Sequence, residues 1–172
     1  MIQFCPGWYV VYTKPRHEKK VANELSSLKV TSFLPTVKRL RLWSDRKKYI
    51  DTPLFPSYVF VNLLNDQCYY NTLDIHGLLH YVRTGKEIAR VHESVIESIR
   101  LIVSNKESCI EVSSEYLQPG RKLCIKEGPF TGFCCEVIYY KGKQKVVVRL
   151  ELLQRNILVD IPAEYLMPAS AL

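Results

Sequence analysis

The sequence predicts a two-part α+β protein, and three observations predict it. Strand-like and helix-like patterns alternate over residues 1–106, only short strand-like runs follow residue 118, and a segment rich in Ser and Glu joins the two parts. Such alternation is typical of an α/β sandwich with a mostly antiparallel sheet and flanking helices, whereas evenly spaced short strands are typical of a small barrel. We therefore expect one domain over 1–106, a linker over 107–117 with the boundary near residue 112, and a second domain over 118–172.

Each element of the N-terminal part has its own signal. Alternating large side chains predict strands, apolar residues at helical spacing predict helices, and proline and glycine mark the ends. Residues 44–47 have the composition of a turn, and we expect Gly77 to end the second helix in the left-handed conformation. The expected elements are strands at 8–12, 32–43, 48–51, 57–63 and 79–82, and helices at 16–28, 67–75 and 92–103.

The segment PLFPSYVFV at residues 53–61 is the most informative part of the chain. Its prolines fix φ and discourage pairing before Ser57, so SYVFV can begin as a strand. Alternation then places Tyr58 and Phe60 on one face and Val59 and Val61 on the other. We expect the valines to hold the sheet to its helices and the aromatic residues to form a surface.

The C-terminal part reads as strands separated by EGPFTG and KGKQ turns, expected at 122–126, 134–140, 145–150 and 157–161. Its cysteines, like those of the rest of the chain, show no CxxC spacing and no His-Cys cluster. We therefore expect no zinc site, no other metal and no cofactor, and we interpret all six cysteines as buried, reduced thiols of a cytoplasmic protein.

The charge is unevenly distributed. Residues 1–60 contain 11 Lys and Arg against 4 Asp and Glu, whereas the remaining residues contain 13 of each, so the whole excess of +7 lies in the first third. A local excess predicts a local anionic partner, and nucleic acid is the leading candidate. A membrane surface is not expected, because no basic amphipathic helix stands free, no signal peptide is visible, and no apolar run approaches about 20 residues.

Nothing in the sequence indicates an enzyme. The four histidines are far apart, and no GxSxG, HExxH or phosphate-binding loop is present. We therefore expect a binding protein without catalytic residues.

The segments WYVVYTKPRHEKK at 8–20 and PLFPSYVFV resemble the N-terminal (NGN) domain of the NusG family of transcription elongation factors. Residues 119–166 resemble its KOW domain, although Cys135 and Gln154 stand where the family usually has glycine. The resemblance implies an NGN α/β sandwich followed by a linker and an SH3-like KOW β-barrel. The chain is most similar to specialised UpxY-type antiterminators of polysaccharide operons, as the opening segment, the short KOW tail and the basic N-terminal balance indicate.

The charge of the basic hairpin with Lys38, Arg39, Arg41, Arg46, Lys47 and Lys48 indicates that it could track a nucleic-acid backbone, with Trp43 offering a stacking surface. The resemblance also implies site residues, and Lys14, Arg16, Lys19, Lys20 and His76 would approach upstream or non-template DNA. The other implied contacts are Trp8, Tyr12, Tyr58 and Phe60 to the clamp helices of the largest RNA polymerase subunit, Tyr69, Tyr70, Asn71 and Thr72 toward the gate loop of the other large subunit, and Phe130, Leu152 and Leu153 to a KOW partner.

Plainer interpretations stay open for each set. The aromatic residues could be core residues, the first helix could present a solvated basic face, the 69–72 segment could be a helix start, and the hairpin could be kept soluble and unpaired by its charge.

The function implied is that of a factor which binds RNA polymerase through its N-terminal domain, suppresses pausing or termination and increases processivity. Its KOW domain would bind a small-subunit ribosomal protein, and Rho is the less expected partner because of the glycine departures. Two alternatives remain: a general NusG-like pausing or termination factor, and a KOW-type RNA-binding or ribosome-associated protein without polymerase contact.

Overall fold

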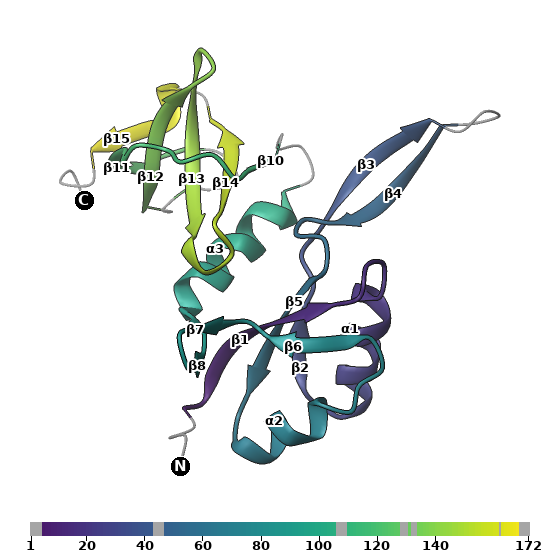
Figure 1. Ribbon diagram of the computed structural model, residues 1–172. Helices are drawn as coiled ribbons and strands as arrows, with labels where there is room; N and C mark the ends of the chain where they lie inside the picture. The colour runs from purple at the N-terminus through teal and green to yellow at the C-terminus, as the bar shows by residue number, and fades with distance from the viewer. Residues whose placement is uncertain are drawn as a thin grey trace. The chain divides into compact units, whose positions relative to one another are not determined.

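A computed structural model describes residues 5–42, 47–105, 110–127, 131, 134–161 and 163–168. The chain divides into two compact units, Met1–Ile96 and Glu97–Leu172, each with a sheet of its own (Figure 1). The domain limits expected from the sequence stay predictions. Within the described ranges, no helix is long and apolar enough to cross a membrane.

The sheet of the first unit is antiparallel and has β1 (Gly7–Thr13) at its centre. On one side β1 pairs with β5 (Tyr58–Leu63), which in turn pairs with β2 (Thr31–Phe33). On the other side it pairs with β6 (Leu78–Tyr81) and with the short β9 (Arg90–Val91). The first strand of the chain is therefore the strand on which the sheet is built.

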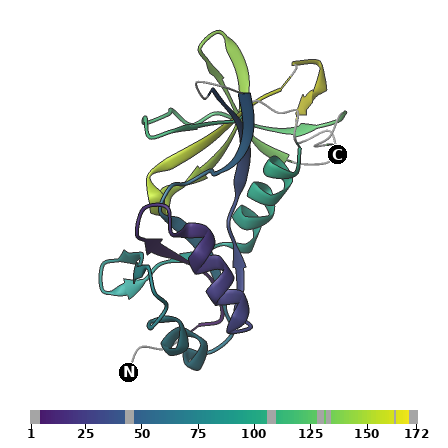
Figure 2. The same ribbon diagram turned by 90° about the vertical axis from the view of Figure 1, so that its right-hand side faces the viewer.

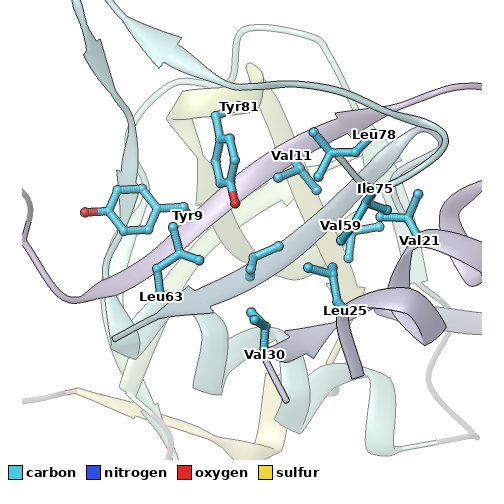
Figure 3. Close-up of a cluster of buried hydrophobic side chains, with 11 residues drawn as sticks. Tyr9, Val11, Val21, Leu25, Val30, Val59, Leu63, Ile75, Leu78 and Tyr81 are labelled. Carbon is cyan, nitrogen blue, oxygen red and sulfur yellow. The ribbon is translucent and has the colours of Figure 1, made fainter. Parts of the chain in front are cut away.

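One face of this sheet carries α1 (Glu18–Ser27) and α2 (Asp66–Thr72), and the core lies between the sheet and these helices. Val21 and Leu25 of α1 pack with Val59 and Val61 of β5, and all four are fully buried (Figure 3). Figure 2 shows α1 lying along the sheet. Each such side chain contributes about 1.5–3 kcal/mol when it leaves water. The prediction that the valines hold the sheet to its helices is confirmed.

The single strand predicted over 32–43 is wrong, because the chain forms two strands there. β2 stays in the main sheet, whereas β3 (Thr36–Leu42) leaves it and pairs with β4 (Lys47–Pro53) in a two-stranded ribbon (Figure 1). The break falls at Pro35, because proline has no N–H for a ladder and restricts the residue before it. The Pro35 carbonyl instead accepts a hydrogen bond of 2.8 Å from the Leu54 N–H.

Other predicted ends need correction. α2 ends at Thr72 rather than near residue 75, and Gly77 is not its cap. Gly77 instead forms the turn into β6 with φ +99°, where an added Cβ would lie 2.9 Å from His17 Cδ2. β5 begins at Tyr58, because Ser57 is left-handed with φ +67°. The hairpin of β7 (Arg83–Thr84) and β8 (Glu87–Ile88) was not predicted, since two-residue strands leave no alternation to detect.

The second unit contains most of α3 (Glu93–Ser104), close to the predicted helix, and a six-stranded antiparallel sheet. Four strands correspond to predicted ones, whereas the first lies in the predicted linker and the last was not foreseen. No pairing between the edge strands closes this sheet among the described residues, so the SH3-like barrel stays a prediction. In sheet order the strands are β10 (Ile110–Ser113), β14 (Arg155–Asp160), β13 (Lys143–Leu150), β12 (Cys134–Tyr140), β11 (Arg121–Ile125) and β15 (Leu166–Pro168), with 3-10 turns at Glu151–Leu153 and Ala163–Tyr165.

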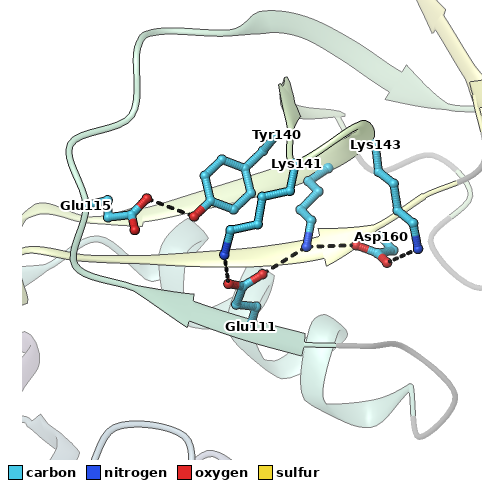
Figure 4. Close-up of polar contacts among 7 residues, drawn as sticks. Glu111, Glu115, Tyr140, Lys141, Lys143 and Asp160 are labelled. Atoms are coloured by element: carbon cyan, nitrogen blue, oxygen red, sulfur yellow. Dashed lines mark hydrogen bonds and ion pairs between the residues drawn. The ribbon is translucent and has the colours of Figure 1, made fainter.

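Ion pairs through Lys145 of β13 join β10 and β14 (Figure 4). Lys145 of β13, only 7% exposed, lies 3.0 Å from Glu111 of β10 and 3.0 Å from Asp160 of β14. Hydrogen bonds from Lys145 and Lys141 lower the pKa of Glu111. Burial works to raise the pKa of Asp160, but its contacts with Lys145 and Lys143 outweigh burial and lower it. A buried cation is thus matched by two carboxylates, as such a cation requires.

The expectation of six reduced thiols is wrong for Cys124, which is disulfide-bonded. In the β11–β12 ladder the backbone of Cys134 is paired with that of Cys124. A search of the sequence for CxxC spacing does not detect such a pair, because it depends on how two strands pair. Cys5, Cys68 and Cys135 are free thiols, and Cys5 is exposed rather than buried. Burial raises the pKa of Cys135 to about 11.

Candidate functional site

The face of the first sheet that lies opposite α1 and α2 is rich in aromatic rings. Tyr12 of β1 stands directly between Tyr58 of β5 and His80 of β6, so the three side chains share this face. Phe33 and Phe60 are opposite each other in the β2–β5 ladder. The members of this aromatic face are Trp8, Tyr12, Phe33, Tyr58, Phe60 and His80.

Three of these rings form a strip near the surface. The ring centroids of Tyr12 and Tyr58 are 5.2 Å apart, and both residues are half-buried. The exposed His80 stacks on Tyr12 with a centroid distance of 5.3 Å and an interplanar angle of 25°. Aromatic rings held in this way offer a large contact area at low entropic cost. We call Tyr58, Tyr12 and His80 the three-ring strip.

The remaining predicted members of this surface lie deeper. Trp8 is 2% exposed and Phe60 is fully buried. Phe60 packs against Phe33 and Phe55, with centroids 6.0 Å from each. Of the four residues predicted to form the surface, Tyr12 and Tyr58 are partly accessible, whereas Trp8 and Phe60 are buried.

His80 was not predicted as a site residue. Its strand reads LLHY, which carries no alternation, and the β1–β6 ladder pairs His80 with Tyr12. Only the pairing of β1 with β6, about 70 residues apart in the chain, could have revealed it.

A buried hydrogen bond fixes the start of β5 and therefore Tyr58. The Ser57 N–H donates to Glu18 Oε1 at 2.7 Å, and the Ser57 carbonyl accepts from the Thr13 N–H at 2.8 Å. Glu18 is 6% exposed and lies in the first turn of α1, where the helix dipole favours a carboxylate. The left-handed Ser57 turn is thus tied to both α1 and β1.

Cations gather where β1 ends and α1 begins. The Lys14 N–H donates to the Gly77 carbonyl at 2.8 Å, which brings the loop before β6 against the start of α1. The rings of His17 and His76 are 5.9 Å apart, and Lys20 Nζ lies 3.4 Å from His76 Nδ1. Arg16 and Lys19 are also exposed here. We call Lys14, Arg16, His17, Lys19, Lys20 and His76 the basic cluster, and it begins two residues after Tyr12.

The four residues of α2 predicted to face the gate loop differ in access. Tyr70 is 60% exposed and Asn71 is exposed, whereas Tyr69 packs on the ring of Tyr81 at 4.9 Å. Thr72 is fully buried, and its hydroxyl is hydrogen-bonded to the Tyr69 carbonyl and to the Tyr81 hydroxyl. Burial raises the pKa of Tyr81 to about 12. Tyr70 and Asn71 are therefore the members that a partner could touch.

The remaining predicted contact residues are the hairpin cations and the C-terminal residues, and they differ in exposure. Lys38, Arg39, Lys47 and Lys48 are exposed on the β3–β4 ribbon, while Arg46 and Trp43 lie outside the described residues, as does Phe130. Leu152 is half-buried and Leu153 is 8% exposed. Gln154 is left-handed with φ +50°, so the turn keeps a conformation that suits glycine although glutamine occupies it.

Exposed rings and cations on a sheet and its adjoining loops are features of a protein that binds macromolecules. Among the described residues, no group of three or more His, Cys, Asp or Glu side chains could hold a metal ion. A family model described as "Transcription termination factor nusG" matches residues 6–100. The chain belongs to the NusG family of transcription factors.

Relatives from several bacteria match most of the chain. The "Transcription termination/antitermination protein NusG" of Chlamydia pneumoniae is 25% identical over 156 residues, which cover 83% of this chain and 85% of the relative. The protein of the same name from Halalkalibacterium halodurans is 25% identical over 170 residues, covering 90% and 94%. A solved structure entitled "Domain interaction in Thermotoga maritima NusG" has a TM-score of 0.49 and 22% identity, covering 96% of this chain and 98% of its own.

Proposed function

We propose that this chain is an elongation and antitermination factor that binds RNA polymerase through its N-terminal unit. The observation that carries the proposal is the three-ring strip, in which Tyr12 and Tyr58 are half-buried and His80 is exposed. Aromatic anchors of this kind dominate protein interfaces, each worth about 2 kcal/mol or more. The strip would receive the clamp helices of the largest polymerase subunit, with the buried Trp8 and Phe60 on the same face of the sheet.

The basic cluster extends the proposed surface toward DNA. It begins two residues after Tyr12. When polymerase is bound to the strip, Lys14 and Arg16 would therefore lie near it and could contact the upstream duplex or the non-template strand. Lys and Arg contacts to phosphates give affinity that depends on salt and little on sequence. Tyr70 and Asn71 of α2 are proposed contacts toward the gate loop, because they are the exposed members of their segment.

The mechanism is selective binding of one polymerase state. A factor that binds the elongating state more tightly than the opened or paused state shifts the equilibrium by the difference in affinity. No covalent chemistry is needed, and a differential affinity of about 1.4 kcal/mol changes the ratio of the two states tenfold.

The experiment is capture of core RNA polymerase by the purified chain. We expect Tyr12→Ala with Tyr58→Ala to abolish capture, and His80→Ala to weaken it. Tyr139→Ala is the matched control, because Tyr139 is 76% exposed and lies in the other unit. Circular dichroism checks that the variants are folded. Undiminished capture by the folded double variant contradicts the assignment of the strip.

A second proposal concerns the genes served and the C-terminal unit. The likeness of the WYVVYTKPRHEKKV opening to UpxY-type factors supports action at polysaccharide operons, and the Glu151–Leu153 turn with Leu152 is the proposed contact for a small-subunit ribosomal protein. In vitro transcription over a pause and a terminator should show increased read-through when the chain is added. Unchanged read-through contradicts an antitermination role.

The relatives favour one alternative. Those named above carry the name "Transcription termination/antitermination protein", which mentions no particular operon, and match 83% or more of the chain, which supports a general NusG-like factor. Genome-wide occupancy separates the two functions, because a general factor follows polymerase on most transcribed genes and a specialised one is confined to a few operons.

A further inference from the structure

The β3–β4 ribbon has two different faces. Residues directly opposite in an antiparallel ladder share a face, and alternate residues along a strand do so too. Leu40 is paired with Tyr49, and Leu42 with Lys47, so these four side chains lie on one face together with Lys38 and its partner Asp51. Arg39 and Lys48 lie on the other. We call Lys38, Leu40, Leu42, Lys47 and Tyr49 the ribbon face.

This face exposes apolar surface. Leu42 is 71% exposed, Tyr49 is 67% exposed and Leu40 is 47% exposed. Both strands belong to a two-stranded sheet and pair with each other, so within the described part of the chain no other strand covers them. Adjoining exposed apolar side chains are more typical of a binding surface than of a solvated edge.

The charge around these side chains identifies the kind of partner. Lys38, Arg39, Lys47 and Lys48 are exposed, and none of them takes part in an ion pair among the described residues. Among the described residues of the ribbon, Asp51 is the one carboxylate on the same face. Protein interfaces are depleted in Lys, whereas Lys38 and Lys47 on the same face as an aromatic residue match a polyanion that also presents flat apolar groups.

We propose that the ribbon face binds single-stranded nucleic acid, with a base stacked on the ring of Tyr49 and with Leu40 and Leu42 beside it. Phosphates then contact Lys38 and Lys47, the two cations of the same face. Duplex DNA satisfies the cations but keeps its bases stacked on one another, so only an unpaired strand uses the aromatic and apolar side chains. This inference rests on the nucleic-acid contact in the proposed function, and it assigns single-strand preference to a different surface from the basic cluster.

The test is binding of a labelled 20-nucleotide oligomer, as single-stranded DNA, as RNA of the same sequence, and as duplex DNA, measured by fluorescence anisotropy with the full chain. Stacking of one base is worth about 1–3 kcal/mol, so we expect Tyr49→Ala to weaken single-strand binding by about fivefold or more and to change duplex binding less than about twofold. Tyr49→Phe keeps the ring and should retain single-strand binding. The tighter of the two single strands identifies whether DNA or RNA is the natural source.

Further variants separate the contribution of base stacking from that of the phosphate contacts. Lys38→Ala with Lys47→Ala should weaken the binding of single strands and of duplex alike and reduce the dependence on salt. Tyr139→Ala should change neither. The inference is overturned if Tyr49→Ala binds single strands as tightly as the wild type, or loses single-strand and duplex binding equally. If Lys14→Ala with Arg16→Ala weakens DNA binding and Tyr49→Ala does not, the inference fails while the proposed DNA contact stands; if the wild type binds no oligomer, both fail.

Discussion

Removal of the Glu18 carboxylate tests how the turn before Tyr58 is held. Glu18 Oε1 accepts the Ser57 N–H at 2.7 Å in a buried position. In Glu18→Ala this N–H has no acceptor, at a cost of about 1–3 kcal/mol. The favourable contact of the carboxylate with the N-terminal end of α1, about 0.3–1 kcal/mol, is lost as well. We expect a destabilisation of about 2–3 kcal/mol, and about 1 kcal/mol for Glu18→Gln, which keeps an acceptor.

The assay is urea unfolding followed by tryptophan fluorescence. Trp8 and Trp43 both belong to the first unit, so this signal reports the unit that contains the turn. A loss of about 2 kcal/mol lowers the midpoint by about 1–2 M urea with an unchanged slope. Glu24→Ala is the control, because Glu24 is on the same helix and its carboxylate makes no hydrogen bond or ion pair among the described residues. A Glu18→Ala midpoint within error of the Glu24→Ala midpoint refutes the reasoning.

Three further measurements follow. Gly77→Ala forces a Cβ into a position with φ +99°, so we expect a loss of about 1–3 kcal/mol by the same urea assay, and an unchanged midpoint contradicts the need for glycine. Hydrogen bonds from Arg149 lower the pKa of Glu136 in the folded protein, so the stabilisation they give is present above about pH 4.3 and is lost as the pH falls through the lower folded pKa. We therefore expect the difference in unfolding free energy between wild type and Arg149→Met, measured by circular dichroism, to become smaller below about pH 4. A difference that does not change with pH contradicts this. Burial raises the pKa of Cys135 to about 11, so iodoacetamide at pH 8 should alkylate the exposed Cys5 well before Cys135, and equal rates by peptide mass spectrometry count against the burial of Cys135.

The sequence predicted those elements in which a local pattern coincides with burial. WYVVY and SYVFV alternate because one side of β1 and of β5 faces the helices, so strands and faces could both be assigned. The accessible pair Tyr12 and Tyr58 follows from the same pattern. Whether Trp8 and Phe60 are accessible depends on what covers them, and that is a property of packing rather than of alternation.

Other features depend on contacts between distant parts of the chain. His80 joins the strip through pairing with β1, and Glu18 reaches Ser57 across 39 residues. β10 has the composition of a linker, yet backbone pairing with β14 and the Lys145 ion pairs order it. Local propensity carries no information on such pairings, which is why these features could not be predicted.

The central position of β1 has a consequence for synthesis of the chain. β1 leaves the ribosome first, but its neighbours β5, β6 and β9 end at Leu63, Tyr81 and Val91. At about 5–20 residues per second, the last neighbour follows roughly 4–16 s later. Until β5 has been made, roughly 3–10 s after β1, the apolar Trp8–Val11 segment, which is buried in the finished sheet, has no strand to pair with. The central strand is therefore made before every strand that pairs with it, and nascent chains expose it to chaperones for seconds.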